Sequence, residues 1–206
     1  MDLSLLAVLC LPWILVALYG VLFIRLPSPL PRGGPFPSAG ALGVSIIVPA
    51  RNEEENLPDL LASLTALDYP SFEILVVDDE STDRTRDIVF STPKGNADAL
   101  RLVRGRPLPP DWLGKPWACH QGYGEAGEGL LLFTDADTRH DPDLLTGAVR
   151  CLLEEEGDAL TLLGRQIMGS FWERLLQPQF FMLLAFRFPR TGRPKPARKW
   201  KDAIAN

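Results

Sequence analysis

The chain has 206 residues, of which 46% are hydrophobic and 23% are charged, and its formal net charge is -5 at pH 7. This apolar content is enough for the core of one domain of ordinary size, and it excludes a disordered chain. The acidic balance argues against a general nucleic-acid-binding protein, and three scattered cysteines have no metal-ligand or redox spacing. One short segment near the carboxyl terminus is strongly basic and contains Arg187, Arg190, Arg193, Lys195, Arg198, Lys199 and Lys201.

The amino-terminal segment is the most apolar part of the chain. Residues 3–24 contain no charged side chain, and a helix of that length, at about 1.5 Å per residue, crosses a hydrocarbon core of about 30 Å. This pattern predicts one transmembrane helix, in an anchor at residues 1–26. A secretory signal would need basic residues before the apolar run, where the only charge is Asp2.

The segment after the predicted anchor indicates its orientation. Arg25, Arg32 and Arg51 follow the apolar run, so the positive-inside rule places the rest of the chain in the cytoplasm, at the cell membrane. Residues 27–42 are rich in Pro and Gly and are predicted to form a linker. A globular domain is expected at residues 43–168.

A strand, a helix and a second strand open this domain. Residues 44–48 are rich in β-branched side chains and are closed by Pro49, and residues 72–77 form a second apolar run. Leucines recur between them on one helical face, at Leu57, Leu60, Leu61 and Leu64. This order predicts a βαβ unit and therefore an α/β fold with a mostly parallel sheet.

The next elements are shorter. Ser81 or Thr82 is expected to cap a second helix, and residues 100–103 are predicted to form a third strand. Residues 105–116 contain four prolines and form a long loop, of the kind that is usually functional or mobile. A helix is expected to follow, through Gln121.

An apolar run that ends on two carboxylates follows in the chain. Residues 130–133 show no alternation, which favours a strand covered on both faces, and Asp135 and Asp137 come directly after it. Ligands of parallel sheets bind beyond the carboxyl ends of the strands, and carboxylate oxygens suit Mg²⁺ or Mn²⁺. Asp141 is expected to cap the helix that continues through residues 142–156.

The last part of the chain is predicted less uniquely. Residues 159–163 are expected to form a further strand. Residues 171–188 fit either an interfacial helix, within an amphipathic and basic membrane-proximal segment at residues 169–206, or a core helix whose partner lies elsewhere. Because no stop signal precedes Asn206, we expect that the carboxyl-terminal part is missing.

Four motifs resemble those of family 2 glycosyltransferases in order and spacing, over roughly residues 44–163. They are Val48-Pro49-Ala50-Arg51-Asn52-Glu53, Val77-Asp78-Asp79-Glu80-Ser81-Thr82-Asp83, Gly114-Lys115 and Asp135-Ala136-Asp137. The resemblance implies a Rossmann-like GT-A fold, a nucleotide-sugar donor, and metal-assisted transfer with inversion at the anomeric carbon. Residues 111–118 are similar to the branch that modifies hopanoid, carotenoid or other lipid acceptors.

The resemblance also implies roles for individual residues. It assigns donor binding to Pro49, Arg51, Glu53, Asp78, Asp79, Lys115 and Asp135. Only one of Asp78 and Asp79 is expected to contact the base or ribose. Asp135 and Asp137 are the implied ligands of Mg²⁺ or Mn²⁺, and Lys115 is a candidate partner of the phosphates.

The catalytic base has no candidate in this sequence. Family members carry a further acidic residue beyond the Asp-x-Asp motif, and nothing after Asp137 matches it. His120 and His140 are expected to make polar or surface contacts, and Trp112 and Trp117 are expected to pack. Three hypotheses stay open: a membrane-bound glycosyltransferase, a non-catalytic nucleotide-sugar-binding module, and a metal-dependent nucleotidyltransferase.

Overall fold

A computed structural model describes residues 11, 14, 15, 18, 30, 34, 36, 37 and 40–187 of the chain. The chain divides into two compact units. One unit consists of Leu30–Leu160 together with Asn206, and the other consists of Met1–Pro29 and Thr161–Ala205.

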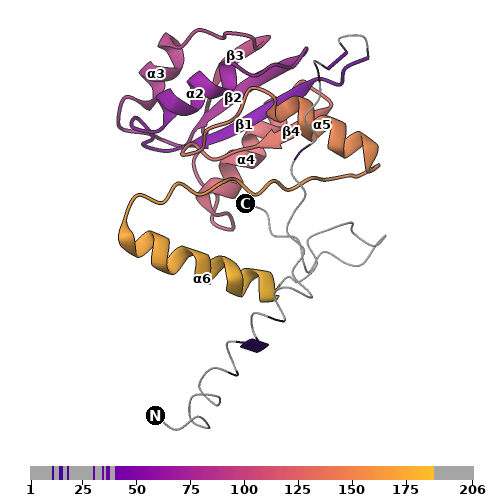
Figure 1. Cartoon of the computed structure of the whole chain (residues 1–206). Helices are drawn as coiled ribbons and strands as arrows, with labels where there is room; N and C mark the ends of the chain where they lie inside the picture. The colour runs from indigo at the N-terminus through magenta and orange to yellow at the C-terminus, as the bar shows by residue number, and fades with distance from the viewer. Residues whose placement is uncertain are drawn as a thin grey trace. The chain divides into compact units, whose positions relative to one another are not determined.

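A parallel sheet forms the centre of the larger unit (Figure 1). In the described part of the chain its strand order is β3-β2-β1-β4, and each neighbouring pair is parallel. The strands are β1 (Val44–Ala50), β2 (Phe72–Asp78), β3 (Ala99–Arg104) and β4 (Leu130–Phe133). The predicted α/β fold with a parallel sheet is therefore confirmed.

Helices cover both faces of this sheet. Leucines of α2 (Leu57–Thr65) pack on one face with side chains of α3 (Thr85–Ser91) and α5 (Leu144–Glu154). The predicted stripe is fully buried at Leu57, Leu60, Leu61 and Leu64. On the other face Ala118 of α4 (Gly114–Glu125) packs against Ile47, Leu75 and Val77. The core therefore lies in two layers, one on each side of the sheet.

Strand β1 does not end before Pro49, as the sequence predicted, but runs through it to Ala50. The Ile47 carbonyl accepts from the Thr134 N–H, so residues 47 and 49 direct their backbone groups toward β4. Since β4 ends opposite Ile47, no strand on that side requires the N–H that Pro49 lacks.

Strand β4 is not covered on both faces, contrary to the prediction. Leu130 and Leu132 pack partly against the larger core, whereas Leu131 and Phe133 are 38% and 43% exposed. Leu131 and Phe133 lie on the same face as Ile47, where α4 covers β1 and β2. The apolar run at residues 130–133 therefore forms an edge strand that is covered on one face, although its sequence shows no alternation.

Three local predictions are also corrected. Neither Ser81 nor Thr82 caps α3, which begins at Thr85 after Arg84. Helix α5 begins at Leu144 and not at residue 142, because the Pro142 carbonyl accepts the Asp68 N–H at 2.7 Å and leaves the helical ladder. Residues 159–163 form no strand, and the division between the two units falls inside that segment.

The described part of the smaller unit contains α6 (Phe171–Arg187). Ser170 and Glu173 form a reciprocal cap, in which the Glu173 N–H donates to Ser170 Oγ and the Ser170 N–H donates to Glu173 Oε2, both at 3.2 Å. These hydrogen bonds, with one from the Gly169 N–H, lower the pKa of the Glu173 carboxyl. The Ser-x-x-Glu pattern was the available sequence signal for this helix start.

Two predictions about the membrane fall largely on other residues. The predicted anchor at residues 1–26 lies outside the described residues except at Leu11, Ile14, Leu15 and Leu18, which are helical. The basic residues from Arg190 onward also lie outside them. Among the helices that the structure describes, none combines the length and the apolar character needed to cross a bilayer.

Candidate functional site

The loops that follow β1, β2 and β4 meet the start of α4 at one end of the sheet. We call this region the carboxyl edge and define it as residues 49–56, 78–84, 114–115 and 134–143. Parallel strands place all their carboxyl ends on the same edge, which is where ligands of such sheets bind. The motifs that were far apart in the sequence are therefore neighbours in the fold.

Two ion pairs connect these motifs across the carboxyl edge. Lys115 Nζ lies 2.6 Å from Asp135 Oδ1, and Arg51 Nη1 lies 3.7 Å from Asp79 Oδ2. Gly114 joins the two pairs, since a Cβ atom at that position would lie 3.2 Å from Asp79 Oδ2. Four predicted site residues, Lys115, Asp135, Arg51 and Asp79, are thus linked through Gly114. A fifth, Asp78, precedes Asp79 in the sequence.

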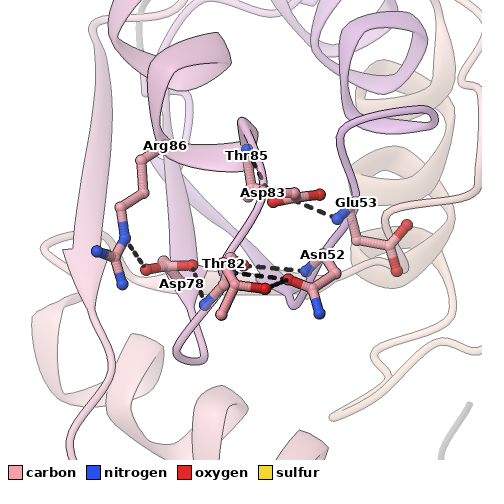
Figure 2. Close-up of polar contacts among 8 residues, drawn as sticks. Asn52, Glu53, Asp78, Thr82, Asp83, Thr85 and Arg86 are labelled. Atoms are coloured by element: carbon pink, nitrogen blue, oxygen red, sulfur yellow. Dashed lines mark hydrogen bonds and ion pairs between the residues drawn. The ribbon is translucent and has the colours of Figure 1, made fainter.

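The loops after β1 and β2 hold each other through backbone-to-side-chain hydrogen bonds (Figure 2). The Asn52 N–H donates to Ser81 Oγ at 3.0 Å, and the Thr82 N–H donates to Asn52 Oδ1 at 2.9 Å. Asn52 and Glu80 have positive φ angles of 55° and 60°, a conformation that asparagine tolerates well. The two hydrogen bonds of Asn52 join residues 29 and 30 positions apart and stabilise its backbone in this conformation.

Further hydrogen bonds join the same two segments closer to α2 and α3. The Glu53 N–H donates to Thr85 Oγ1 at 2.9 Å, and the Glu54 N–H donates to Asp83 Oδ2 at 3.0 Å. Asp83 Oδ1 also accepts the Thr85 N–H at 3.0 Å. Sequence reasoning missed this role of Asn52, Asp83 and Thr85. The signal was available in the short polar side chains of both loops, which commonly bond to backbone groups.

Asp78 and Asp79 occupy different environments. The Asp78 carboxylate is fully buried, accepts the Ser81 N–H at 3.0 Å, and forms an ion pair with Arg86 Nε at 2.5 Å (Figure 2). The Asp79 carboxylate is 12% exposed, and its one ion pair within the described residues is with Arg51. Asp78 therefore organises the loop, and Asp79 is the one available to a ligand.

Glycine is required where β3 ends beside these carboxylates. A Cβ atom on Gly105 would lie 2.6 Å from the Asp78 carbonyl oxygen, which itself accepts the Gly105 N–H at 2.9 Å. Any larger residue would push the chain away from the carboxyl edge. This glycine was not singled out in the sequence, because nothing in a Pro-rich loop marks one glycine as a close approach.

The remaining predicted residues of the first loop are placed less directly. Pro49 is half-buried and lies inside β1, so it belongs to the end of the strand and not to the loop that follows it. The Glu53 carboxylate accepts Asn56 Nδ2 at 2.9 Å, and the Glu53 carbonyl accepts the Leu57 N–H at 2.9 Å. These two bonds lead the chain into α2.

Asp135 and Asp137 emerge beyond β4, where the sequence predicted them. The Asp135 side chain is 41% exposed and Asp137 is also exposed. Within the described residues no group of three or more His, Cys, Asp or Glu side chains is arranged to hold a metal ion. Two carboxylates still fit Mg²⁺ or Mn²⁺, since these ions commonly take one or two protein carboxylates and complete their octahedron with phosphate and water oxygens.

A polar network holds the loop that carries these two aspartates. Thr138 Oγ1 donates to the Asp135 carbonyl at 2.8 Å and lies 2.9 Å from Thr134 Oγ1. His140 Nε2 lies 2.9 Å from Thr134 Oγ1, and the backbone N–H of His140 donates to Ser63 Oγ at 3.2 Å. Burial lowers the pKa of His140, although Asp141 raises it. The expected polar contact of His140 is therefore confirmed.

Aromatic side chains line up along the first turns of α4. The rings of Trp112 and Trp117 lie 5.1 Å apart, and His120 lies 4.9 Å from the first and 5.6 Å from the second. Trp117 Nε1 donates to the Arg106 carbonyl at 3.0 Å. The expected packing of both tryptophans is confirmed, and it fixes the long loop before α4 onto the helix.

Comparison with known proteins identifies similar sequences. The family model for glycosyl transferase family 2 matches residues 45–204. A 4,4'-diaponeurosporenoate glycosyltransferase of Staphylococcus haemolyticus is 37% identical over 94 residues, which are 46% of this chain and 24% of that protein. A dolichol-phosphate mannosyltransferase of Pyrococcus furiosus is 26% identical over 155 residues, which are 71% of this chain and 42% of that protein.

A solved structure is similar as well. The mannosyltransferase PcManGT from Pyrobaculum calidifontis, in complex with GDP-Man and Mn²⁺, matches with a TM-score of 0.51 and 26% identity. The match covers 71% of this chain and 42% of that one. The chain thus spans less than half the length of these relatives. Because the family model covers more than half of the chain, the chain belongs to glycosyl transferase family 2.

Proposed function

We propose that the chain is the donor-binding part of a membrane-bound glycosyltransferase. The enzyme moves a sugar from a nucleoside-diphosphate sugar to a lipid acceptor at the cytoplasmic face of the cell membrane. The observation that carries this proposal is the pairing of Lys115 with Asp135 and of Arg51 with Asp79 at the carboxyl edge. A diphosphate with a divalent cation can replace both pairs, because it offers anionic oxygens to the basic side chains and a cation to the acidic ones.

The two basic residues have the exposure needed for this exchange. The Lys115 and Arg51 side chains are 54% and 62% exposed, so each can turn from its carboxylate to a phosphate without a change in the backbone. Arg51 presents a planar fork of donors and Lys115 a compact charge. In this proposal Lys115 neutralises the departing diphosphate, and Arg51 contacts the donor beside Asp79.

Asp79 is the proposed contact of the base or ribose. Its carboxylate is mostly buried and contacts Arg51, whereas both oxygens of Asp78 are already occupied, one by the Ser81 N–H and the other by Arg86. Pro49 lies at the end of β1, and the hydrogen bond from the Glu53 N–H to Thr85 Oγ1 holds the loop after β1 against the segment after β2. A loop held in this way is preorganised for the donor, which reduces the entropic cost of binding.

Asp135 and Asp137 are the proposed holders of Mg²⁺ or Mn²⁺. When bound, the cation supplies positive charge against the charge that develops on the leaving diphosphate. Asp135 keeps a free oxygen, Oδ2, while Oδ1 contacts Lys115. The network of Thr134, Thr138 and His140 orients the loop. PcManGT, which was solved with Mn²⁺, supports the use of a divalent cation.

The acceptor and the membrane remain parts of the proposal. The similarity to a 4,4'-diaponeurosporenoate glycosyltransferase and to a dolichol-phosphate mannosyltransferase supports a lipid acceptor. The apolar residues 3–24 and the apolar side chains of α6 support attachment to a membrane. Inversion at the anomeric carbon is supported by the resemblance of the motifs, and the anomeric configuration of the product, measured by NMR, tests it.

A product assay with the enzyme that contains this chain as its donor-binding part separates this function from its alternatives. We expect Mn²⁺-dependent binding of one or a few members of a panel of nucleotide sugars, and release of nucleoside diphosphate when a lipid acceptor is supplied. Release of pyrophosphate would instead identify a nucleotidyltransferase. Donor binding without release in the presence of every acceptor would identify a non-catalytic binding module.

A further inference from the structure

A groove outside the carboxyl edge lies between the edge strand β3 and helix α4. Its volume is about 380 Å³, which is within the range of small-molecule sites. It is lined by Arg101 and Arg104 of β3, by Arg106 just after that strand, and by Trp117, His120 and Gln121 of α4. None of the residues assigned to donor or metal binding lines it.

The arginines give this groove a positive character. Arg101 is already paired, with Nη2 at 2.8 Å from Glu73 Oε2. The guanidinium groups of Arg104 and Arg106 make no ion pair with the described residues, and both residues are exposed. Two unpaired guanidinium groups along one wall offer planar sets of N–H donors, which match phosphate oxygens.

Gln121 adds a buried donor that has no partner. The Arg106 N–H can only donate, and it does so to Gln121 Oε1 at 2.6 Å. This bond determines which end of the amide is the oxygen, so Nε2 is the other end. Gln121 Nε2 is buried and has no hydrogen-bond partner among the described residues. A buried donor without an acceptor is unfavourable, and a ligand oxygen that reaches it would remove that penalty.

The opposite wall is aromatic. Trp117 and His120 are stacked with ring centroids 5.6 Å apart and an interplanar angle of 27°. Because Trp117 Nε1 already donates to the Arg106 carbonyl, the indole can offer only its face. An aromatic surface beside free guanidinium groups suits a ligand that has an anionic head and an apolar body.

We propose that the groove between β3 and α4 is a second binding site, for a phosphate-bearing ligand. The phosphate lies between the guanidinium groups of Arg104 and Arg106, and it accepts from Gln121 Nε2 after that amide, whose Nε2 is buried in the free protein, turns toward the groove. Its substituent lies along Trp117 and His120. Glu125, which also lines the groove, opposes the anion and limits its affinity. The site is independent of the proposed function, since it shares no residue with the donor site.

Calorimetric titration of the full chain in neutral detergent with inorganic phosphate tests the proposal. We expect saturable binding, and about a tenfold loss in each of Arg104→Gln and Arg106→Gln. Arg104→Lys and Arg106→Lys should each lose less, because they keep the charge. Lys94→Gln is the matched control: it removes one positive charge outside the groove, where Lys94 Nζ donates to the Asp98 carbonyl, and should bind as the parent does.

Gln121→Glu is the sharpest variant. Glutamate keeps an oxygen for the Arg106 N–H and nearly the same size, but it replaces the buried donor by an acceptor with negative charge. We expect it to abolish phosphate binding, whereas Glu125→Gln should strengthen binding several-fold. Circular dichroism confirms that each variant is folded. Unchanged phosphate binding in folded Gln121→Glu, or no saturable binding by the parent, would overturn the proposal.

Two arms distinguish the sources of the phosphate. Short-chain phosphatidic acid in the same detergent presents the group as a lipid head, and short-chain phosphatidylcholine is its control. If a lipid is the ligand, the parent should bind phosphatidic acid more tightly than inorganic phosphate, and Gln121→Glu should lose both. If a free phosphate compound is the ligand, phosphatidic acid should bind no more tightly than inorganic phosphate does. Addition of GDP or UDP should leave phosphate binding in the groove unchanged, so failure of this site and failure of the donor site are separate results.

Discussion

Asp78 and Asp79 are neighbours at the end of β2, and we expect the first to stabilise the fold and the second to bind the ligand. Asp78 is buried and holds Ser81 and Arg86, whereas Asp79 reaches the carboxyl edge beside Arg51. Two consecutive residues of a strand point to opposite sides, so one of a pair can serve the fold while the other serves the site.

Alanine at position 78 should lower mainly the stability of the fold, and alanine at position 79 should lower mainly the affinity for the ligand. Asp78→Ala removes the acceptor of the buried Ser81 N–H and of the partly exposed Arg86 guanidinium, so the free energy of unfolding should fall by about 2 kcal/mol. Asp79→Ala should unfold nearly as the parent does but weaken binding of nucleoside diphosphate by roughly 1.5–3 kcal/mol, the usual value for a hydrogen bond to a charged group. Urea unfolding and calorimetry measure the two quantities. Equal losses of affinity in both variants would show that the assignment is wrong.

His140 should make stability depend on pH in a defined direction. Burial lowers its pKa below the ordinary value of 6.5, so the folded state binds a proton less readily than the unfolded state does. The free energy of unfolding should therefore be constant above that value and should fall as the pH drops below it. His140→Gln should have a smaller slope between about pH 7 and pH 5 in urea unfolding. Equal slopes in parent and variant would refute this role.

At the scale of elements, a buried polar cluster joins the end of α4 to the start of the sheet. Glu73 on β2 accepts Ser45 Oγ and the Gly127 N–H, both at 2.7 Å, and pairs with Arg101 on β3. Burial alone would raise the pKa of Glu73, but the hydrogen bonds from Gly127, Ser45 and Arg101 lower it overall. The cluster fixes the distal end of α4, and through the helix it supports Gly114 and Lys115 at the carboxyl edge.

Removal of the Glu73 charge should destabilise the fold only at pH values at which Glu73 is ionised. Because its folded pKa lies below the ordinary value of 4.5, its stabilisation is present above that pH and is lost as the pH falls through the folded pKa. Glu73→Gln should lower the free energy of unfolding by about 1–3 kcal/mol at pH 7 and by much less at about pH 3. Urea titrations at both pH values measure this difference. A variant that is equally destabilised at both would indicate a packing effect instead.

The main elements were predictable because their signals are local. The leucine stripe of α2 and the β-branched runs of β1 and β2 record the side of each element that faces the core. Asp135 and Asp137 were placed correctly for the same reason, since they directly follow an apolar run. The order of the strands in a parallel sheet then brings these segments to one edge.

The errors have a common physical cause, which is that they depend on partners distant in the chain. Pro49 seemed to end β1, but a strand tolerates proline where its neighbour has ended. Ser81 seemed to cap a helix, but Asn52, 29 residues earlier, uses its hydroxyl. The exposure of Leu131 and Phe133 depends on which strands α4 covers. A single sequence contains no record of these pairings.

For the whole molecule, attachment to a membrane is expected to use two separate devices. Residues 3–24 should anchor by apolar burial, which salt does not weaken, whereas residues 171–201 should act partly through basic side chains. Deletion of residues 1–26 should leave a protein that sediments with anionic vesicles at 0.1 M salt and is largely released at 1 M, because the Debye length falls from about 10 Å to about 3 Å. The full chain should stay bound at both concentrations.

Charge replacement supplies the control for this experiment. In the shortened protein, glutamine should abolish the binding at low salt when it replaces Arg193, Lys195, Arg198, Lys199 and Lys201. A shortened protein that ignores vesicles under all conditions would instead support a core role for residues 171–188.

The central claim is that the carboxyl edge holds a nucleoside-diphosphate sugar with a divalent cation, and Asp137→Asn tests it most directly. The substitution removes a negative charge at almost constant size from an exposed side chain, so the fold should be unchanged. Calorimetric titration with the preferred nucleotide sugar in the presence of Mn²⁺ is the measurement. We predict that the parent binds only with Mn²⁺ and that the variant shows no Mn²⁺-dependent binding. A variant that binds the donor with Mn²⁺ as tightly as the parent does would contradict the account.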